Sequence, residues 1–207
     1  MMENLPFDLV SLSADDVQSL EDTYKALRAK FSISLYDSTD IPIKQFDLLN
    51  SGPDKTIGGT LLINTPANNL HLVFLKIHYS YYGLRSTTRS DYYKYQVWAF
   101  INSNKDFGRV LIRHETFNDR LVGLIHPCEL EFKDDKPFDH KFYVVCNDEQ
   151  KALLAMNFNF RNAVMDMGDD MLLETAGHSI IIGNNMAVEA EQTIRLVEFA
   201  CKVAALK

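Results

Sequence analysis

The chain has 207 residues, of which 46% are hydrophobic and 24% are charged. These proportions are typical of a folded globular protein and exclude collagen-like, low-complexity and disordered chains. The 28 acidic and 21 basic residues give a formal net charge of −7. Because nucleic-acid binding depends on cations that neutralise phosphates, this balance predicts that nucleic acid is not a partner.

The predicted relation to membranes follows from the apolar runs. The longest run, residues 70–75, is interrupted by His71 and is much shorter than the roughly 20 residues that cross a bilayer. We therefore expect no transmembrane segment. The first ten residues contain no basic stretch followed by an apolar one, so we expect no secretory signal within them. We expect a cytoplasmic location, and the alternative is a targeting segment outside the given sequence.

The first predicted element is a helix over residues 14–29. Ser13 and Asp16 form a weakened capping box at its start, and apolar side chains recur along it every three or four residues. The alternation of residues 31–35 then predicts a strand. A second, short apolar strand is predicted over residues 60–63.

The most regular part of the sequence predicts a long β-hairpin. Residues 70–82 and 92–101 alternate in side-chain character, and a segment rich in arginine, serine and threonine joins them. We expect the odd-numbered residues of both strands to share one face, which packs on a core and leaves the phenol hydroxyls in solvent. These residues are Val73, Leu75, Ile77, Tyr79, Tyr81, Tyr93, Tyr95, Val97, Ala99 and Ile101.

The second half of the chain predicts shorter strands and three further helices. Residues 117–124 fit a short helix or a turn, and residues 133–137 fit a charged loop. Strands are expected at residues 110–112, 130–132, 142–146, 171–175 and 178–182. Helices are expected from Asp148 onward, over residues 158–167 and over residues 187–206.

The predicted fold class follows from the order of these elements. Strands outnumber helices, most connections are short, and there is no series of βα units with a glycine-rich first turn. We therefore predict an α+β fold, with a mainly antiparallel sheet flanked by an N-terminal helix, a central helical pair and a long C-terminal helix. One domain is expected over residues 1–207, with residues 103–106 as the place where it would divide.

The predicted hairpin is also the candidate binding surface. Six of the nine tyrosines lie between positions 79 and 95, together with several cations. Rings interleaved with cations suit stacking on a flat ligand, but tyrosine also suits a half-exposed strand that binds nothing, and both interpretations stay open. The expected ligand is a protein or a small molecule. The candidate binding residues are Tyr79, Tyr81, Arg85, Arg89, Tyr93 and Tyr95.

Motifs for catalysis and metal binding are absent from the sequence. There is no nucleophile elbow, no H-E-x-x-H and no complete phosphate-binding loop. The three cysteines lack CxxC spacing, and the one close His/Cys pair lacks two further zinc ligands, so we predict no catalytic residue, no metal and no cofactor. A hydrolase is the alternative, because histidines can meet carboxylates in the folded chain. The candidate histidines are His114, His126, His140 and His178.

The last predicted helix offers a second contact surface. Its apolar stripe is wide enough to pack on the chain's own sheet or on a second copy of the chain. A self-associating structural protein is therefore a third interpretation, beside a binding domain and a hydrolase. The residues that would form a homo-oligomer are Ile194, Val197, Phe199 and Val203.

Three segments between Tyr81 and Ile182 carry a resemblance. The first is the basic loop 85–89 with the aromatic strand 92–97. The second is Phe138 with the strand 142–145 and the acidic helix start 148–149, and the third is the Glu174 strand with the Gly177 turn and the strand 180–182. Together they resemble a bacterial family of domains of unknown function that often follow two membrane helices. The resemblance implies an α+β binding or accessory domain and no reaction, and this chain has no counterpart of the two helices.

Overall fold

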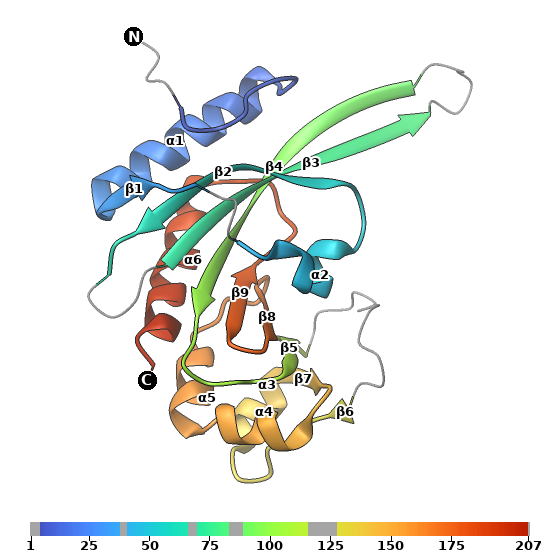
Figure 1. Ribbon diagram of the computed structural model, residues 1–207, viewed down its shortest axis with the longest axis vertical. Coiled ribbons are helices and arrows are strands. Elements are labelled where there is room, and N and C mark those ends of the chain that lie inside the picture. Colours follow the sequence, from blue (N-terminus) through green and yellow to red (C-terminus); the bar gives the residue numbers. More distant parts are fainter. Residues whose placement is uncertain (1–4, 38–40, 66–69, 83–88, 116–127, 207) are drawn as a thin grey trace.

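The computed structural model describes residues 5–37, 41–65, 70–82, 89–115 and 128–206. Within these ranges, nine strands form one sheet in the order β1-β2-β3-β4-β9-β8-β5-β7-β6. Each of the eight neighbouring pairs is antiparallel. The predicted α+β class is confirmed, with helices at both ends and a helical pair between them (Figure 1).

Strands from both sides of residues 103–106 belong to this sheet. The strands are β1 (Ile33–Leu35), β2 (Lys55–Ile63), β3 (Leu70–Tyr82), β4 (Arg89–Asn102), β5 (Arg109–His114), β6 (Cys128–Glu129), β7 (Phe142–Cys146), β8 (Leu172–Ala176) and β9 (Ser179–Gly183). The α-helices are α1 (Ala14–Lys30), α2 (Asp47–Asn50), α3 (Lys136–Lys141), α4 (Glu149–Ala155), α5 (Phe158–Val164) and α6 (Ala190–Ala204). A 3-10 helix, η2 (Ile43–Gln45), precedes α2. None of the helices in the described part of the chain has the length and hydropathy needed to cross a membrane.

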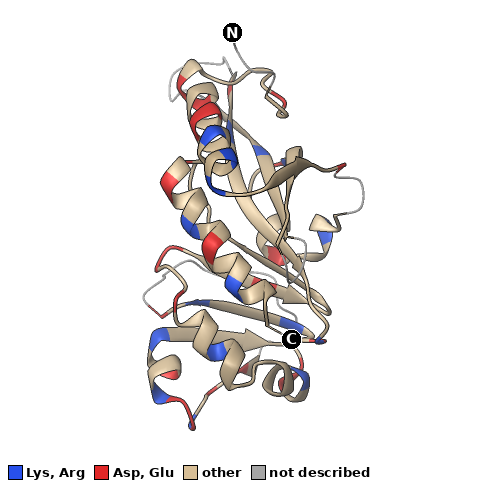
Figure 2. Ribbon diagram, turned by 90° about the vertical axis from the view of Figure 1, so that its left-hand side faces the viewer, with Lys and Arg blue, Asp and Glu red and all other residues tan. Residues whose placement is uncertain are grey.

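The two long helices lie together on one side of the sheet. At the start of α1 the Ser13 hydroxyl accepts a hydrogen bond from the backbone N–H of Asp16 at 3.1 Å, as the capping box predicts. An ion pair of 2.6 Å between Lys30 and Glu198 joins α1 to α6. Figure 2 shows that acidic and basic residues are interspersed along both helices, which suits their solvent-facing sides.

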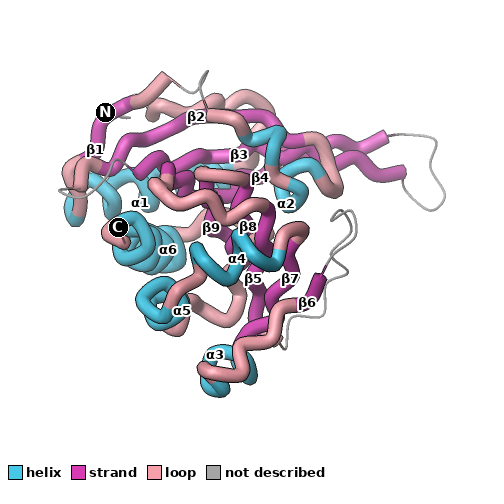
Figure 3. The backbone as a smooth tube through the Cα atoms, turned by 60° about the horizontal axis from the view of Figure 1, so that its bottom comes forward, coloured by secondary structure: helices cyan, strands magenta, loops and turns pink. Residues whose placement is uncertain are grey.

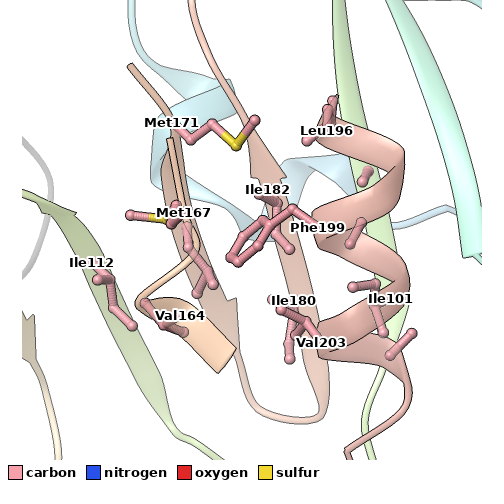
Figure 4. Packing of buried hydrophobic residues seen from close by; sticks show 14 of the residues in the cluster. Ile101, Ile112, Val164, Met167, Met171, Ile180, Ile182, Leu196, Phe199 and Val203 are labelled. Atoms are coloured by element: carbon pink, nitrogen blue, oxygen red, sulfur yellow. The ribbon is translucent and has the colours of Figure 1, made fainter. Parts of the chain in front are cut away.

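The apolar stripe of α6 packs on the chain's own sheet. Val197, Phe199 and Val203 are buried in one large core with residues of α1, α3, α4 and α5, and Ile194 packs against the same core. Figure 4 shows Phe199 and Val203 pointing toward Ile180 and Ile182 of β9. Of the two predicted packings, the structure shows the one on the chain's own sheet, because the burial of Val197, Phe199 and Val203 within one chain already removes their apolar surface from water. Self-association through the α6 stripe stays a prediction.

A second, smaller core covers the opposite face of the sheet. Phe46 and its neighbours in residues 41–50 pack on Trp98 and Phe100 of β4, and the rings of Phe46 and Phe100 meet at 6.2 Å in an edge-to-face contact. The central part of the β3–β4 hairpin is thus buried on both faces. The expectation that only one face packs on a core is wrong here.

The register of the hairpin also differs from the prediction. Tyr79 lies opposite Tyr92, and Tyr93 lies opposite His78, so Tyr79 and Tyr93 point to opposite faces. Alternation tells which residues of one strand share a face, but not how two strands are aligned. A shift of one residue reverses the match between them.

Several boundaries and elements differ from those that the sequence predicts. The edge strand β6 is Cys128–Glu129 rather than residues 130–132, and part of the expected charged loop forms α3, which the Asp135 side chain caps. Strand β2 starts at Lys55, five residues earlier than predicted. Helix α6 starts at Ala190 rather than 187, and the sequence did not indicate η2 or α2. Residues 117–124 lie outside the described part of the chain.

Candidate functional site

The outer part of the β3–β4 hairpin projects from the sheet. We call residues 78–82 and 89–94 the hairpin arm. Strand β2 pairs with β3 only as far as Ile77, and β9 pairs with β4 only from Trp98 onward. Apart from one hydrogen bond from His78 N to Asp54 O at 2.9 Å, the two strands of the arm make their ladder with each other alone among the described residues (Figures 1 and 3).

The arm carries a stacked aromatic pair on each face. The rings of Tyr79 and Tyr92 lie 4.9 Å apart at an angle of 8°, and those of His78 and Tyr93 lie 4.8 Å apart at 18°. Tyr92 is 41% exposed, whereas Tyr79 and Tyr93 are half-buried. Burial raises the pKa of Tyr79, and the neighbouring Tyr92 adds to this effect. The Tyr79 hydroxyl therefore stays protonated at neutral pH and can donate a hydrogen bond.

The cations near the arm are only partly available to a ligand. Lys76 lies 4.9 Å from the Tyr93 ring, but its side chain is buried, and its ammonium donates hydrogen bonds to Asp8 Oδ2 at 2.7 Å and Val10 O at 2.6 Å. The hydrogen bond from Lys76 lowers the pKa of Asp8. Lys94, in contrast, is exposed. The charge of Lys76 thus holds the N-terminal segment on the sheet.

Tyr95 is a core residue at the base of the arm. It is 1% exposed, and its hydroxyl donates a hydrogen bond to Asp8 O at 2.8 Å. The ring lies against Gly58 at a register shift in β2, where an added Cβ would overlap the phenol. The prediction that the Tyr95 ring is shared between interior and solvent is therefore wrong.

The other predicted binding residues cannot all be placed. Tyr81 and Arg89 lie in the two strands of the arm, but their side chains are not described. Arg85 lies outside the described residues. The structure therefore brings Tyr79 and Tyr93 onto one projecting arm, on opposite faces of it, and adds Tyr92 and His78, which the sequence analysis did not single out.

A surface groove lies beside α6, next to residues 165–171. It has a volume of about 700 Å³, and apolar residues and side chains of both charges line it. Two of its carboxylates have partners: Asp166 pairs with Lys202 at 2.7 Å, and Asp170 accepts a hydrogen bond from Asn184 at 2.8 Å. Lining residues include Asp166, Asp170, Met171, Arg195, Phe199 and Lys202. The ion pair between Asp166 and Lys202 holds the segment of residues 165–171 against α6.

The candidate histidines lie in different elements of the described part of the chain: His114 ends β5, His140 lies in α3 and His178 lies between β8 and β9. His114 Nε2 lies 3.1 Å from Asp169 Oδ1, yet neither ring nitrogen makes an aligned hydrogen bond. Its ring packs against Phe142 instead. Among the described residues, no three His, Cys, Asp or Glu side chains gather as a metal site would require. His126 lies outside these residues, so the hydrolase alternative stays a prediction.

A buried carboxylate that the sequence analysis did not single out attaches residues 41–50, which cover the second core, to the sheet. Glu174 in β8 accepts hydrogen bonds from the backbone N–H groups of Asp47 and Leu48, both at 2.8 Å, and its Oε1 lies 3.9 Å from Arg109. Arg109 also pairs with Asp47 and donates to Gln45 O. Glu174 is the acidic residue of an otherwise apolar or small-residue strand, and that pattern is the signal that could have revealed it.

The protonation of Glu174 depends on two opposing effects. Burial raises the pKa of Glu174 to about 7, and this effect exceeds the opposing effects of the two backbone hydrogen bonds and of Arg109. The carboxyl group therefore changes charge near neutral pH. Its contacts go to the chain's own backbone, so we assign it to the attachment of residues 41–50.

Comparisons with known proteins add a likeness in fold. No family model matches the chain, and no curated protein matches its sequence. The crystal structure of the mycobacterial trehalose monomycolate transport factor A, TtfA, is similar, with a TM-score of 0.55. The match covers 88% of this chain and 90% of that chain at 10% sequence identity. At that identity the likeness shows the fold alone.

Proposed function

We propose that this chain is a non-catalytic binding or accessory domain that recognises a protein partner through the hairpin arm. The observation that carries the proposal is the arm itself, a two-stranded projection with a stacked aromatic pair on each face. Small ligands bind mostly in concave sites that surround them, and a two-stranded projection is convex. The shape of the arm therefore favours a protein over a small molecule.

The chemistry of the arm supports the same choice. Tyrosine is enriched among the residues that dominate protein interfaces, because it buries a large ring at low entropic cost and keeps a hydroxyl for hydrogen bonding. Stacking of Tyr79 on Tyr92 holds both rings in place before binding. An isolated two-stranded ribbon is marginally stable in water, so contact with a partner would also stabilise the arm.

The accessory part of the proposal draws on the likeness in fold. TtfA is described as a transport factor. We propose by analogy that this chain assists other proteins in a bacterial cell rather than catalysing a reaction, and the resemblance to the bacterial domain family points the same way. Its cytoplasmic location is also part of this proposal. Nothing in the analogy carries the trehalose monomycolate of TtfA over to this chain.

Site-specific crosslinking in cells can test the proposal. A photoreactive amino acid at position 92 should capture a distinct protein, whereas the same group at position 35 should not. Leu35 is the matched control because it is 66% exposed on the edge strand β1 and is apolar. With the captured protein purified, Tyr92→Ala should weaken its affinity by about tenfold or more, which corresponds to about 1.4 kcal/mol.

The same affinity measurement can also contradict the proposal. Leu35→Ala should bind the captured partner as the parent chain does, and thermal unfolding should show that both variants fold. Equal affinities of the parent chain, Tyr92→Ala and Tyr79→Ala would show that the arm is not the recognition surface.

A further inference from the structure

Two cysteines that are distant in sequence lie directly opposite each other at the edge of the sheet. Cys128 of β6 and Cys146 of β7 are paired in the antiparallel register. Residues that pair in this way share one face of the sheet, with Cβ atoms about 4.5–5.5 Å apart. A disulfide requires Cα atoms about 4.4–6.8 Å apart and Cβ atoms near 3.8 Å, so a small approach of the two strands brings the sulfurs into bonding range.

The strand that must move is the one with the fewest constraints. β6 is a two-residue strand at the edge of the sheet and pairs with β7 alone among the described strands. Next to it, Leu130 N donates a hydrogen bond to Val144 O at 3.0 Å, which keeps the two strands aligned. The register therefore places the thiols together while the edge position allows the approach.

The two thiols differ in access. Cys128 is exposed, whereas Cys146 is buried in the large core. Burial raises the pKa of Cys146 to about 11, and the nearby Cys128 contributes to the increase. A thiolate is the attacking species in disulfide exchange, so Cys128 is the thiol that meets an oxidant first. Once Cys128 is bonded to another sulfur, its contribution to the raised pKa of Cys146 disappears.

We propose that Cys128 and Cys146 form a thiol–disulfide site that is oxidised by a small organic disulfide of the glutathione type. In the first step the Cys128 thiolate attacks one sulfur of the oxidant, an S–S bond breaks, and one small thiol leaves. In the second step Cys146 loses its proton and attacks the Cys128 sulfur, and the second small thiol leaves. Two protein thiols are oxidised to one disulfide, and one small disulfide is reduced to two thiols.

The bond would fasten the edge of the sheet. It would close a covalent loop from 128 to 146, which contains α3 and the carboxylates of Asp134 and Asp135 that hold the buried Arg161 at 2.8 and 2.9 Å. It would also link β6 to the strand that ends two residues before Asp148, the N-cap of α4. Oxidation would thus hold the edge strand on the sheet, and reduction would release it.

Oxidation of the full-length chain tests this site. The reduced protein is incubated with oxidised glutathione, and the remaining thiols are counted after unfolding. The count should fall from three to one, and peptide mapping should join the Cys128 and Cys146 peptides. Cys201→Ser is the matched control, because Cys201 lies in α6 and should not be needed for this bond. That variant should still form the same disulfide.

Two further variants separate the steps. Cys146→Ser should accumulate glutathione on Cys128, because the second attack is lost, and Cys128→Ser should accumulate none on Cys146. Three remaining thiols in the wild-type chain, glutathione that stays on Cys128, or a disulfide between two chains would each overturn the proposal. The mapping of the wild-type chain decides the matter even if a variant fails to fold.

Discussion

The inner and outer halves of one hairpin have opposite environments. Both halves consist of the same two strands, and both contain aromatic residues. In the inner half, residues 70–77 and 95–101, the side chains are buried, and the two cores take up apolar residues from both faces. In the outer half, the hairpin arm, Tyr79 and Tyr93 are only half-buried and Tyr92 is exposed.

The two halves differ in burial because different segments pack on them, not because the strands themselves differ. The large core covers one face of the inner half, and residues 41–50 cover the other. The arm extends past both covers, so the same kind of aromatic residue is structural in one half and available to a partner in the other. The predictions below test this contrast, from the largest expected effect to the smallest.

Substitution in the inner half should be the most damaging. Trp98 is 1% exposed in the second core, and Trp98→Ala should lower the free energy of unfolding by about 3–5 kcal/mol through lost burial and the cavity left behind. Urea unfolding measures the change, with Tyr92→Ala in the arm as the matched aromatic control. If both variants lost the same free energy of unfolding, the inner half of the hairpin and the arm would not differ in the way described.

The attachment of residues 41–50 should depend on pH through Glu174. Its pKa is about 7 in the folded chain, above the ordinary value of 4.5, so the folded state binds more protons than the unfolded state between these values. The contribution of Glu174 to the free energy of unfolding should therefore fall by about 3 kcal/mol as pH rises from 4.5 to 7, and level off above. Urea unfolding at several pH values should show this fall.

The matched variant for this prediction is Glu174→Gln, which cannot titrate. It should lack the fall between pH 4.5 and 7, while other groups contribute as before. If the parent chain and the Gln variant lose stability equally over that range, then Glu174 does not cause the dependence.

The base of the arm should give a smaller effect. Tyr95→Phe removes the buried hydroxyl that bonds Asp8 O and should cost about 1–2 kcal/mol of unfolding free energy. Tyr93 lies two residues before Tyr95 in the same strand and is half-buried, so Tyr93→Phe should lower the free energy of unfolding by less than about 0.5 kcal/mol. Thermal unfolding of both variants compares the two positions. If Tyr93→Phe lost more unfolding free energy than Tyr95→Phe, the buried inner half of the hairpin would extend beyond Tyr95 into the arm.

Removal of the exposed ring of the arm should also have only a small effect on stability. Tyr92→Ala should lose the stacking on Tyr79 and little buried area, so the free energy of unfolding should fall by less than about 1 kcal/mol. Chemical unfolding measures this. A loss of several kcal/mol would mean that the ring supports the fold, and the arm would then be a structural part of the molecule.

Much of the fold was predictable because its signals are local. The Ser13 cap and the spacing in residues 14–30 identify α1, and the regular alternation identifies β3 and β4. The short η2 and α2 carry no such pattern. They form where Phe46 packs on Phe100 of β4 and where Glu174 accepts hydrogen bonds from the backbone N–H groups of Asp47 and Leu48. These partners are more than 50 residues away in the sequence.

The candidate site was predictable only in outline. Tyrosine-rich composition pointed to the hairpin, but it could not separate the buried Tyr95 from Tyr79 and Tyr93, because burial depends on which other segments cover each position. The pairing of Cys128 with Cys146 was not predictable either, since it follows from strand pairing between positions 18 residues apart.

The amino-acid sequence alone determined the kind of elements and the fold class, because helix and strand periodicity are properties of neighbouring residues. Only the tertiary structure decided the register of the hairpin, the burial of the α6 stripe within one chain and the extent of the arm. Those features depend on contacts between segments far apart in the chain, and a one-residue shift in pairing is enough to exchange the two faces of a strand.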